Sequence, residues 1–186
     1  MHTGQPINPQ LFDIAKINPQ TKNLLILGGS QGARGIDQAL IVSAAALAEQ
    51  GIRVFHQCRK ESLESLEAGY QEAGVEAEVV NFIDDMPAAY AWSNLVLTRS
   101  GLNTVAELEV VGRPGILVPL VGAPEQLENA ENFVESYVGV LLEEDMLGEK
   151  LVASITQLLN LSEAPSAANQ SINSAAQIAE IALNIS

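Results

Sequence analysis

Six short apolar runs alternate with stretches whose apolar residues recur at helical spacing, and this alternation limits the fold more than any other feature. The runs are rich in Val, Ile and Leu and lie at about 23–28, 52–57, 77–82, 94–99, 115–119 and 138–143. The helical stretches follow them at about 35–49, 60–73, 84–92, 104–111, 124–136 and 145–159. Strands that are apolar on both faces and alternate with amphipathic helices typically form a parallel sheet covered by helices on both sides. The sequence therefore predicts an α/β fold, a doubly wound and mostly parallel sheet of six strands.

The 186 residues suffice for one full-sized domain with two flanking segments. Residues 1–21, with three prolines, are expected to form a lead-in segment with one helical turn near residues 12–15. The main domain is expected to span 22–160, and 161–186 to hold a C-terminal helix with a small apolar face.

The charge of the chain excludes nucleic acid as a partner. The sequence has 23 Asp and Glu against 9 Lys and Arg, a net charge of −14, and such a field repels polyanions at long range. A phosphate site must then rest on backbone N–H groups and one or two placed cations. Because Cys58 is the single cysteine, no internal disulfide forms, and we expect a cytoplasmic protein.

The sequence LGGSQGARG (27–35) separates the first strand from the first helix, and two chemical interpretations of it fail or are weak. Gly28–Gly32 matches the G-x-S-x-G elbow of hydrolases, but that nucleophile needs a later histidine, and the only histidines are His2 and His56. A dinucleotide fingerprint needs glycine where Ser30 stands, and no acidic residue closes the second strand.

Phosphate binding is the interpretation of this loop that we favour. Backbone N–H groups and the Ser30 hydroxyl can face a phosphate at the start of the helix. Arg34 either adds a cation there or is a solvated helix residue. The alternative is a tight turn in which the glycines serve only backbone geometry.

Polar residues near the start of two later helices each have two interpretations. Glu107 either completes a capping box with Thr104 or accepts hydrogen bonds from two vicinal sugar hydroxyls. Gln126 and Asn129 lie three residues apart on one helical face, which Pro124 begins. Their amides either recognise sugar hydroxyls or belong to a solvated face.

The remaining chemistry-bearing residues favour no catalytic centre. Asp84 and Asp85 either cap the next helix or suggest a metal, but no further ligand is spaced to complete a site. His56 is expected to be structural. Arg59 and its neighbour Lys60 are placed to lower the pKa of the Cys58 thiol, although nothing else supports thiol chemistry.

Four motifs together resemble the MurG family of peptidoglycan glycosyltransferases. GGSQGARG, VNFIDDMPAAYAWSNLVLTRSG, TVAEL and QLENA stand in the order and spacing of that family, and the resemblance covers residues 3–159. It implies the C-terminal, Rossmann-like half of a two-domain GT-B enzyme, the half that holds the nucleotide-sugar donor.

The resemblance also implies which residues bind the donor, UDP-GlcNAc. They are Gly29, Ser30, Gln31, Gly32, Ile83, Arg99, Ser100, Gly101, Leu102, Glu107, Gln126 and Asn129. Ser30 would contact the diphosphate, the Ile83 backbone the uracil, and Glu107 the ribose hydroxyls. Gln126 and Asn129 would contact the GlcNAc hydroxyls. Neither a metal, a cofactor nor a catalytic residue is implied in this half.

Members of the family transfer GlcNAc with inversion to undecaprenyl-diphospho-MurNAc-pentapeptide, whose binding site belongs to the other half. We therefore expect this chain to bind the donor and to transfer nothing alone. It is then a piece of a longer enzyme, or a subunit that docks on a partner at the inner face of the membrane. Asn8 stands where the family carries an arginine near the donor phosphates, and Pro124-Glu125 replaces a polar pair.

Three rival functions follow from the same residues. The runner-up is a non-catalytic, donor-binding subunit of a split glycosyltransferase. A UDP-GlcNAc epimerase of related architecture needs acidic and histidine groups around the sugar, where only Glu107 and Glu125 are available. A nicotinamide-dependent enzyme ranks lowest because the fingerprint fails.

Overall fold

The sheet consists of six strands in the order β3-β2-β1-β4-β5-β6, and every neighbouring pair is parallel. The structure is a computed structural model that describes residues 7–14, 16–28 and 33–163. Its strands are β1 (Asn23–Leu27), β2 (Arg53–Gln57), β3 (Ala77–Val80), β4 (Leu95–Thr98), β5 (Gly115–Leu117) and β6 (Gly139–Leu141). The predicted doubly wound sheet is confirmed, and it is wholly parallel.

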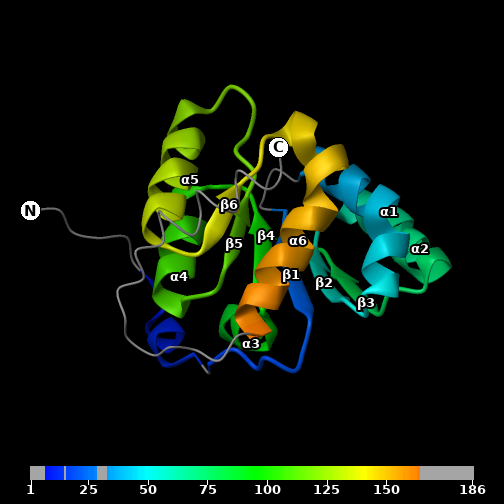
Figure 1. Ribbon diagram of the computed structural model, residues 1–186, viewed down its shortest axis with the longest axis horizontal. Coiled ribbons are helices and arrows are strands. Elements are labelled where there is room, and N and C mark those ends of the chain that lie inside the picture. The colour runs from blue at the N-terminus through cyan, green and yellow to red at the C-terminus, as the bar shows by residue number, and fades with distance from the viewer. Residues whose placement is uncertain (1–6, 15, 29–32, 164–186) are drawn as a thin grey trace, which may run out of the picture.

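Helices cover both faces of this sheet (Figure 1). They are α1 (Arg34–Glu49), α2 (Leu63–Ala73), α3 (Met86–Trp92), α4 (Leu102–Val111), α5 (Pro124–Ser136) and α6 (Leu147–Glu163). Helices α1, α2 and α6 share one apolar core with the sheet, and α3, α4 and α5 share the other. Three short 3-10 turns, η1 (Pro9–Asp13), η2 (Lys60–Ser62) and η3 (Glu144–Met146), complete the described elements.

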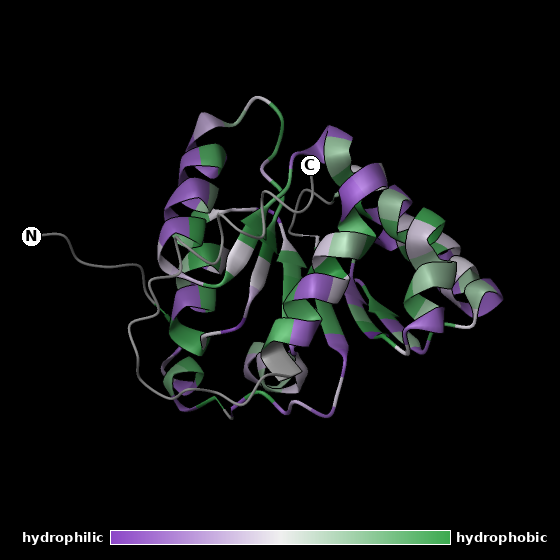
Figure 2. Ribbon diagram, in the orientation of Figure 1, coloured by the Kyte–Doolittle hydropathy of each residue, from purple (hydrophilic) through white to green (hydrophobic). Residues whose placement is uncertain are grey.

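The position of β1 in the middle of the sheet explains why apolar residues run through it without alternation. Leu24 and Ile26 face the α1–α2–α6 core, whereas Leu25 and Leu27 face the α3–α4–α5 core. All five residues of β1 are buried, so both faces of the strand select apolar side chains. Figure 2 shows mostly hydrophobic strands between helices in which hydrophobic and hydrophilic residues are mixed.

The ends of the helices follow local rules, with one correction. Asp85 caps α3 by accepting a hydrogen bond from the N–H of Ala88 at 3.0 Å, as one of the two alternatives predicted. Helix α4 begins at Leu102 with Gly101 as its N-cap, so Thr104 already lies in the first turn. The capping box predicted as an alternative for Thr104 and Glu107 is therefore wrong, because the helix starts earlier than the apolar spacing suggested.

The lead-in segment packs beneath α4. Asn8 caps η1, its Oδ1 accepting from the N–H of Gln10 at 3.0 Å, and Leu11 is buried among residues of α4 and β1. The helical turn thus lies slightly earlier than the predicted 12–15. The predicted C-terminal helix lies mostly outside the described residues, as does Ala15. Within the described ranges, no helix is both long enough and apolar enough to cross a bilayer.

Gly139 lets β6 approach β5 and α5, and this gives a test of the packing. A Cβ at Gly139 would lie 2.7 Å from the Gly115 carbonyl oxygen and 2.8 Å from the Phe133 ring. We expect Gly139→Ala to lower the free energy of unfolding by about 1–3 kcal/mol, because the added methyl group would have to displace the strand backbone and a buried ring. Urea denaturation measures it.

Gly148→Ala is the matched control, because a Cβ in that first turn of α6 meets nothing within 4 Å. It should be neutral or stabilise by up to about 1 kcal/mol, since alanine favours helix. Equal midpoints for the two variants would contradict the packing argument.

Candidate functional site

The candidate site lies where β1 and β4 run side by side in the middle of the sheet. The chain leaves β1 towards β2 and leaves β4 towards β5, so the loops that follow the two strands diverge at their carboxyl ends. Ligands of doubly wound sheets bind in the crevice between such loops. One wall is therefore the start of α1, and the other is the loop before α4.

The start of α1 forms the first wall. The first intrahelical hydrogen bond runs from the Asp37 N–H to the Ala33 carbonyl at 2.8 Å, so the N–H groups of residues 34–36 precede the helical ladder. Ala33, the N-cap, has no side-chain acceptor to cap them. This end of α1 thus carries partial positive charge towards the crevice.

The predicted diphosphate-binding residues Gly29, Ser30, Gln31 and Gly32 lie outside the described residues, and their role stays a prediction. Gly28, just before them, has a clear steric reason to be glycine. A Cβ there would lie 2.9 Å from the carbonyl oxygen of Gln57, because the end of β1 approaches β2 closely.

The loop Arg99–Gly101 forms the second wall, and hydrogen bonds tie it to α5. The buried Ser100 hydroxyl donates to the Gln126 carbonyl at 2.7 Å, and Asn129 Nδ2 donates to the Ser100 carbonyl at 3.1 Å. Gln126 Oε1 in turn accepts from the Leu120 N–H at 3.0 Å. The sequence missed this clamp, which brings the predicted residues of two loops together.

The clamp limits what Gln126 and Asn129 can offer to a ligand. One polar atom of each amide is engaged inside the protein, which leaves Gln126 Nε2 as a donor and Asn129 Oδ1 as an acceptor. A recognition role for the two amides is compatible with this arrangement and stays a prediction. Leu102, also predicted, is half exposed at the first position of α4.

Arg99 is the placed cation that an anionic chain needs. Its side chain is only 12% exposed, and its Nη1 donates to Glu144 Oε2 at 2.7 Å. The same nitrogen lies 3.4 Å from the Val118 carbonyl oxygen and 3.3 Å from that of Pro119. Arg99 therefore joins the ends of β4 and β5 to η3, and nothing in the sequence marked Glu144 as its partner.

Glu107 points towards α3 rather than towards its own helix start. The Tyr90 hydroxyl donates to Glu107 Oε2 at 2.8 Å, and Glu107 Oε1 has no partner within the described ranges. Burial and the adjacent carboxylate raise the pKa of the Tyr90 phenol above its ordinary value. Tyr90 thus stays a donor, holds the carboxylate in one orientation and leaves the second oxygen able to accept from a hydroxyl.

Ile83 lies beside this region, on the loop between β3 and α3. Its side chain is buried, and it lines a cavity of about 540 Å³ together with Asp84, Ala88 and Trp92. The predicted backbone contact with a base stays a prediction.

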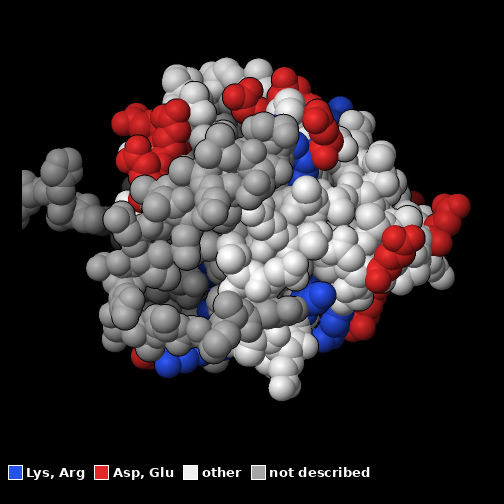
Figure 3. Space-filling model, in the orientation of Figure 1, with Lys and Arg blue, Asp and Glu red and all other residues white. Residues whose placement is uncertain are grey.

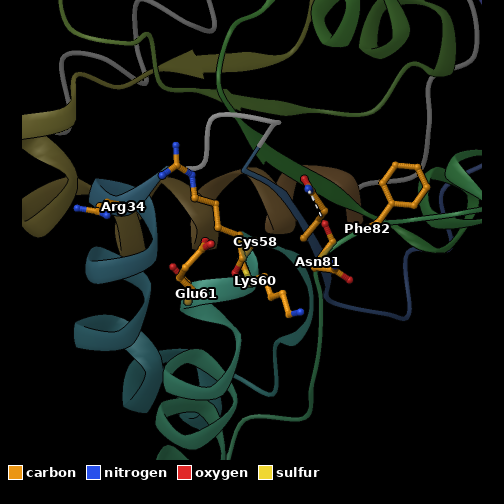
Figure 4. Close-up of a pocket in the computed structure, with 9 residues that line it drawn as sticks. Arg34, Cys58, Lys60, Glu61, Asn81 and Phe82 are labelled. Carbon is orange, nitrogen blue, oxygen red and sulfur yellow. Dashed lines mark hydrogen bonds between the residues drawn. The ribbon is translucent and has the colours of Figure 1, made fainter.

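A second cavity, of about 630 Å³, opens at the carboxyl ends of β2 and β3 (Figure 4). Arg34, Arg59 and Lys60 line it, although the chain has only 9 basic residues in all. Phe82, 68% exposed, lies at its far end from Arg34. Arg34 is exposed at the first position of α1, so it extends the positive side of the first wall.

Cys58 lines the same cavity, and the sequence-based expectation for its thiol is wrong. Burial, followed by the charges of Asp37 and Glu67, raises the pKa of the Cys58 thiol to about 11. The neighbouring Arg59 and Lys60 do not offset these effects. His56 is fully buried, with Nδ1 3.0 Å from the Tyr70 hydroxyl and Nε2 3.3 Å from Asp37, which fits the predicted structural role.

The acidic residues gather on outer helices. In the view of Figure 3 groups of acids lie over α5, over α2 and at the top of the molecule, and the exposed acids of α5 and α2 include Glu128, Glu131, Glu64 and Glu67. Across residues 7–14, 16–28 and 33–163, no group of three or more His, Cys, Asp or Glu is placed to hold a metal ion.

The fold is that of a doubly wound, Rossmann-like α/β domain, and comparison with known proteins narrows the class. The profile of the glycosyltransferase family 28 C-terminal domain matches residues 23–184. The chain therefore belongs to that family.

Two relatives carry the name UDP-N-acetylglucosamine–N-acetylmuramyl-(pentapeptide) pyrophosphoryl-undecaprenol N-acetylglucosamine transferase. That of Nitratidesulfovibrio vulgaris is 41% identical over 127 residues, which are 67% of this chain and 33% of the relative. That of Xanthomonas axonopodis pv. citri is 42% identical over 156 residues, 83% of this chain and 36% of the relative. The chain thus spans about a third of the length of these relatives.

Solved structures agree on the fold. The crystal structure of Acinetobacter baumannii MurG superposes with a TM-score of 0.62 at 24% identity, covering 91% of this chain and 52% of that one. The glycotransferase of kitacinnamycin superposes with a TM-score of 0.60 at 18% identity, covering 96% and 46%. In both, this chain corresponds to about half of a larger molecule.

The raised pKa of Cys58 predicts an unreactive thiol. A shift from 9.0 to about 11 leaves about 100-fold less thiolate at pH 8 than an ordinary cysteine has. Alkylation by iodoacetamide at pH 8 should slow accordingly, and mass spectrometry follows it cleanly because Cys58 is the only cysteine. The chain unfolded in urea is the control and should react at the ordinary rate. Fast alkylation of the folded chain would contradict the burial argument.

Proposed function

We propose that this chain is the UDP-GlcNAc-binding half of an inverting N-acetylglucosaminyltransferase of peptidoglycan synthesis. The observation that carries the proposal is the topological switch point at β1 and β4, in a chain of the glycosyltransferase 28 C-terminal family. One wall offers the start of α1, whose N-cap residue Ala33 has no side-chain acceptor, and the other offers Arg99 and the loop that Ser100 ties to α5.

Each part of the donor has a matching chemical group in this crevice. The diphosphate suits the backbone N–H groups at the start of α1, which need no net positive charge on the protein. The ribose suits Glu107, whose bond to Tyr90 uses Oε2 and not Oε1. The sugar suits the unengaged amide atoms of Gln126 and Asn129. Binding of this kind needs neither a metal nor a cofactor.

Transfer to a lipid-linked acceptor needs groups beyond the donor crevice. An inverting reaction requires the acceptor hydroxyl, a general base and the donor to be held together. We propose that an acceptor half, in the same polypeptide or in a partner subunit, supplies the first two. That half would also bring the chain to the cytoplasmic face of the membrane, where the acceptor undecaprenyl-diphospho-MurNAc-pentapeptide is presented.

Calorimetric titration tests the proposal directly. UDP-GlcNAc and UDP should bind the chain, with affinity that falls as salt rises, and binding should persist in EDTA because no metal takes part. NAD is the control and should give no heat. Binding of NAD without binding of either uridine nucleotide would overturn the assignment.

Glu107→Gln tests the ribose contact without disturbing the fold. The amide oxygen still accepts from Tyr90, but the atom left for the ribose changes from a charged acceptor to a donor. Loss of a charge-assisted hydrogen bond of about 1.5–3 kcal/mol should weaken UDP binding about tenfold or more. The variant should also discriminate less between UDP and 2′-deoxy-UDP.

Glu109→Gln is the matched control, because Glu109 is exposed on the same helix and carries the same charge. Its UDP affinity should stay within about twofold of the original chain. If Glu107→Gln lowered the melting temperature while leaving UDP binding unchanged, Glu107 would be a structural residue only.

A further inference from the structure

Glu144 lies between the two walls of the crevice and contacts both. Its Oε2 accepts from Arg99 Nη1 at 2.7 Å on the side of β4. On the other side, a Cβ added to Gly35 would overlap the Glu144 carboxylate, so that carboxylate rests directly on the first turn of α1. The residue itself belongs to η3, just before α6.

The position of Glu144 has an electrostatic consequence. The start of α1 and the guanidinium of Arg99 are the positive groups that an anionic ligand would use in this crevice. Glu144 presents a negative charge to both. The side chains of Arg99 and Glu144 are only 12% and 28% exposed, so solvent screens this charge less than it would screen a surface ion pair.

We propose that Glu144 is an internal counter-anion that competes with the diphosphate of the nucleotide for Arg99 and for the start of α1. It thereby weakens the binding of nucleoside diphosphates and speeds their release. This inference rests on the proposed function, because it assumes that the diphosphate binds in this crevice.

The contacts of Arg99 favour competition over support. Two backbone carbonyls, those of Val118 and Pro119, already hold the Arg99 guanidinium in place. Glu144 is therefore not the sole group that orients Arg99. If Glu144 instead served to aim Arg99 at the ligand, its removal would weaken binding, so the two roles predict changes of opposite sign.

The test compares Glu144→Gln with Glu143→Gln in the full chain. Both variants remove one negative charge from the chain, but Glu143 is exposed and makes no contact with Arg99 within the described residues. We expect Glu144→Gln to bind UDP about fivefold more tightly at low salt, and Glu143→Gln to stay within about twofold. Stopped-flow measurement should place the gain in slower UDP dissociation.

Two further measurements separate this inference from other effects. Uridine, which lacks phosphates, should bind the original chain and both variants equally. Gly35→Ala displaces the carboxylate without changing any charge, and it should tighten UDP binding in the same direction as Glu144→Gln.

Two outcomes overturn the inference, and they are distinguishable. If Glu144→Gln binds UDP no better than Glu143→Gln, or binds it more weakly, the competition is absent while the nucleotide site stands. If UDP binds neither the original chain nor the variants, the proposed function itself fails.

Discussion

Pairing of β1 with β4 is the constraint on which the rest of this structure depends. Because the two strands are parallel and the chain leaves them in opposite directions, their following loops must separate and leave a crevice. Burial of both faces of the sheet then dictates the apolar strands, and the helices α1 and α4 that start at this edge direct their N-terminal ends to the same place. The location of the site is thus a consequence of chain topology before any polar residue is considered.

Because the chain is acidic overall, the proposed anion site depends on local positive groups. Many exposed acids lie on the outer helices α5 and α2, whereas the start of α1 and the nearly buried Arg99 lie at the carboxyl ends of β1 and β4. Local dipoles and one desolvated cation outweigh a distant negative field, because screening reduces interactions beyond about 10 Å far more than those at contact. Glu144 is the exception, since it places a negative charge at contact distance from Arg99.

Much of the fold, but less of the site, was predictable from the sequence. Periodicity identified every strand and helix of the described ranges because burial imposes it residue by residue. The prediction of a capping box at Thr104 and Glu107 was wrong because α4 starts earlier, with Gly101 as its N-cap. The prediction of a lowered thiol pKa was wrong because the burial of Cys58 outweighs the effect of the basic residues next to it. The partnerships of Tyr90 with Glu107 and of Arg99 with Glu144 join residues 17 and 45 positions apart, so no local pattern encodes them.

These long-range partnerships suggest how the proposed site is preorganised within this domain. Tyr90 orients the Glu107 carboxylate, and the Ser100 clamp ties the β4 loop to α5, so the donor side loses little conformational freedom when a ligand arrives. Such preorganisation favours tight binding, which would slow the departure of a nucleotide product. A counter-anion at Glu144 acts against that tendency, because it takes back the positive groups once the diphosphate leaves. Rigid walls and an internal competitor together would allow a site that is both preformed and quick to empty.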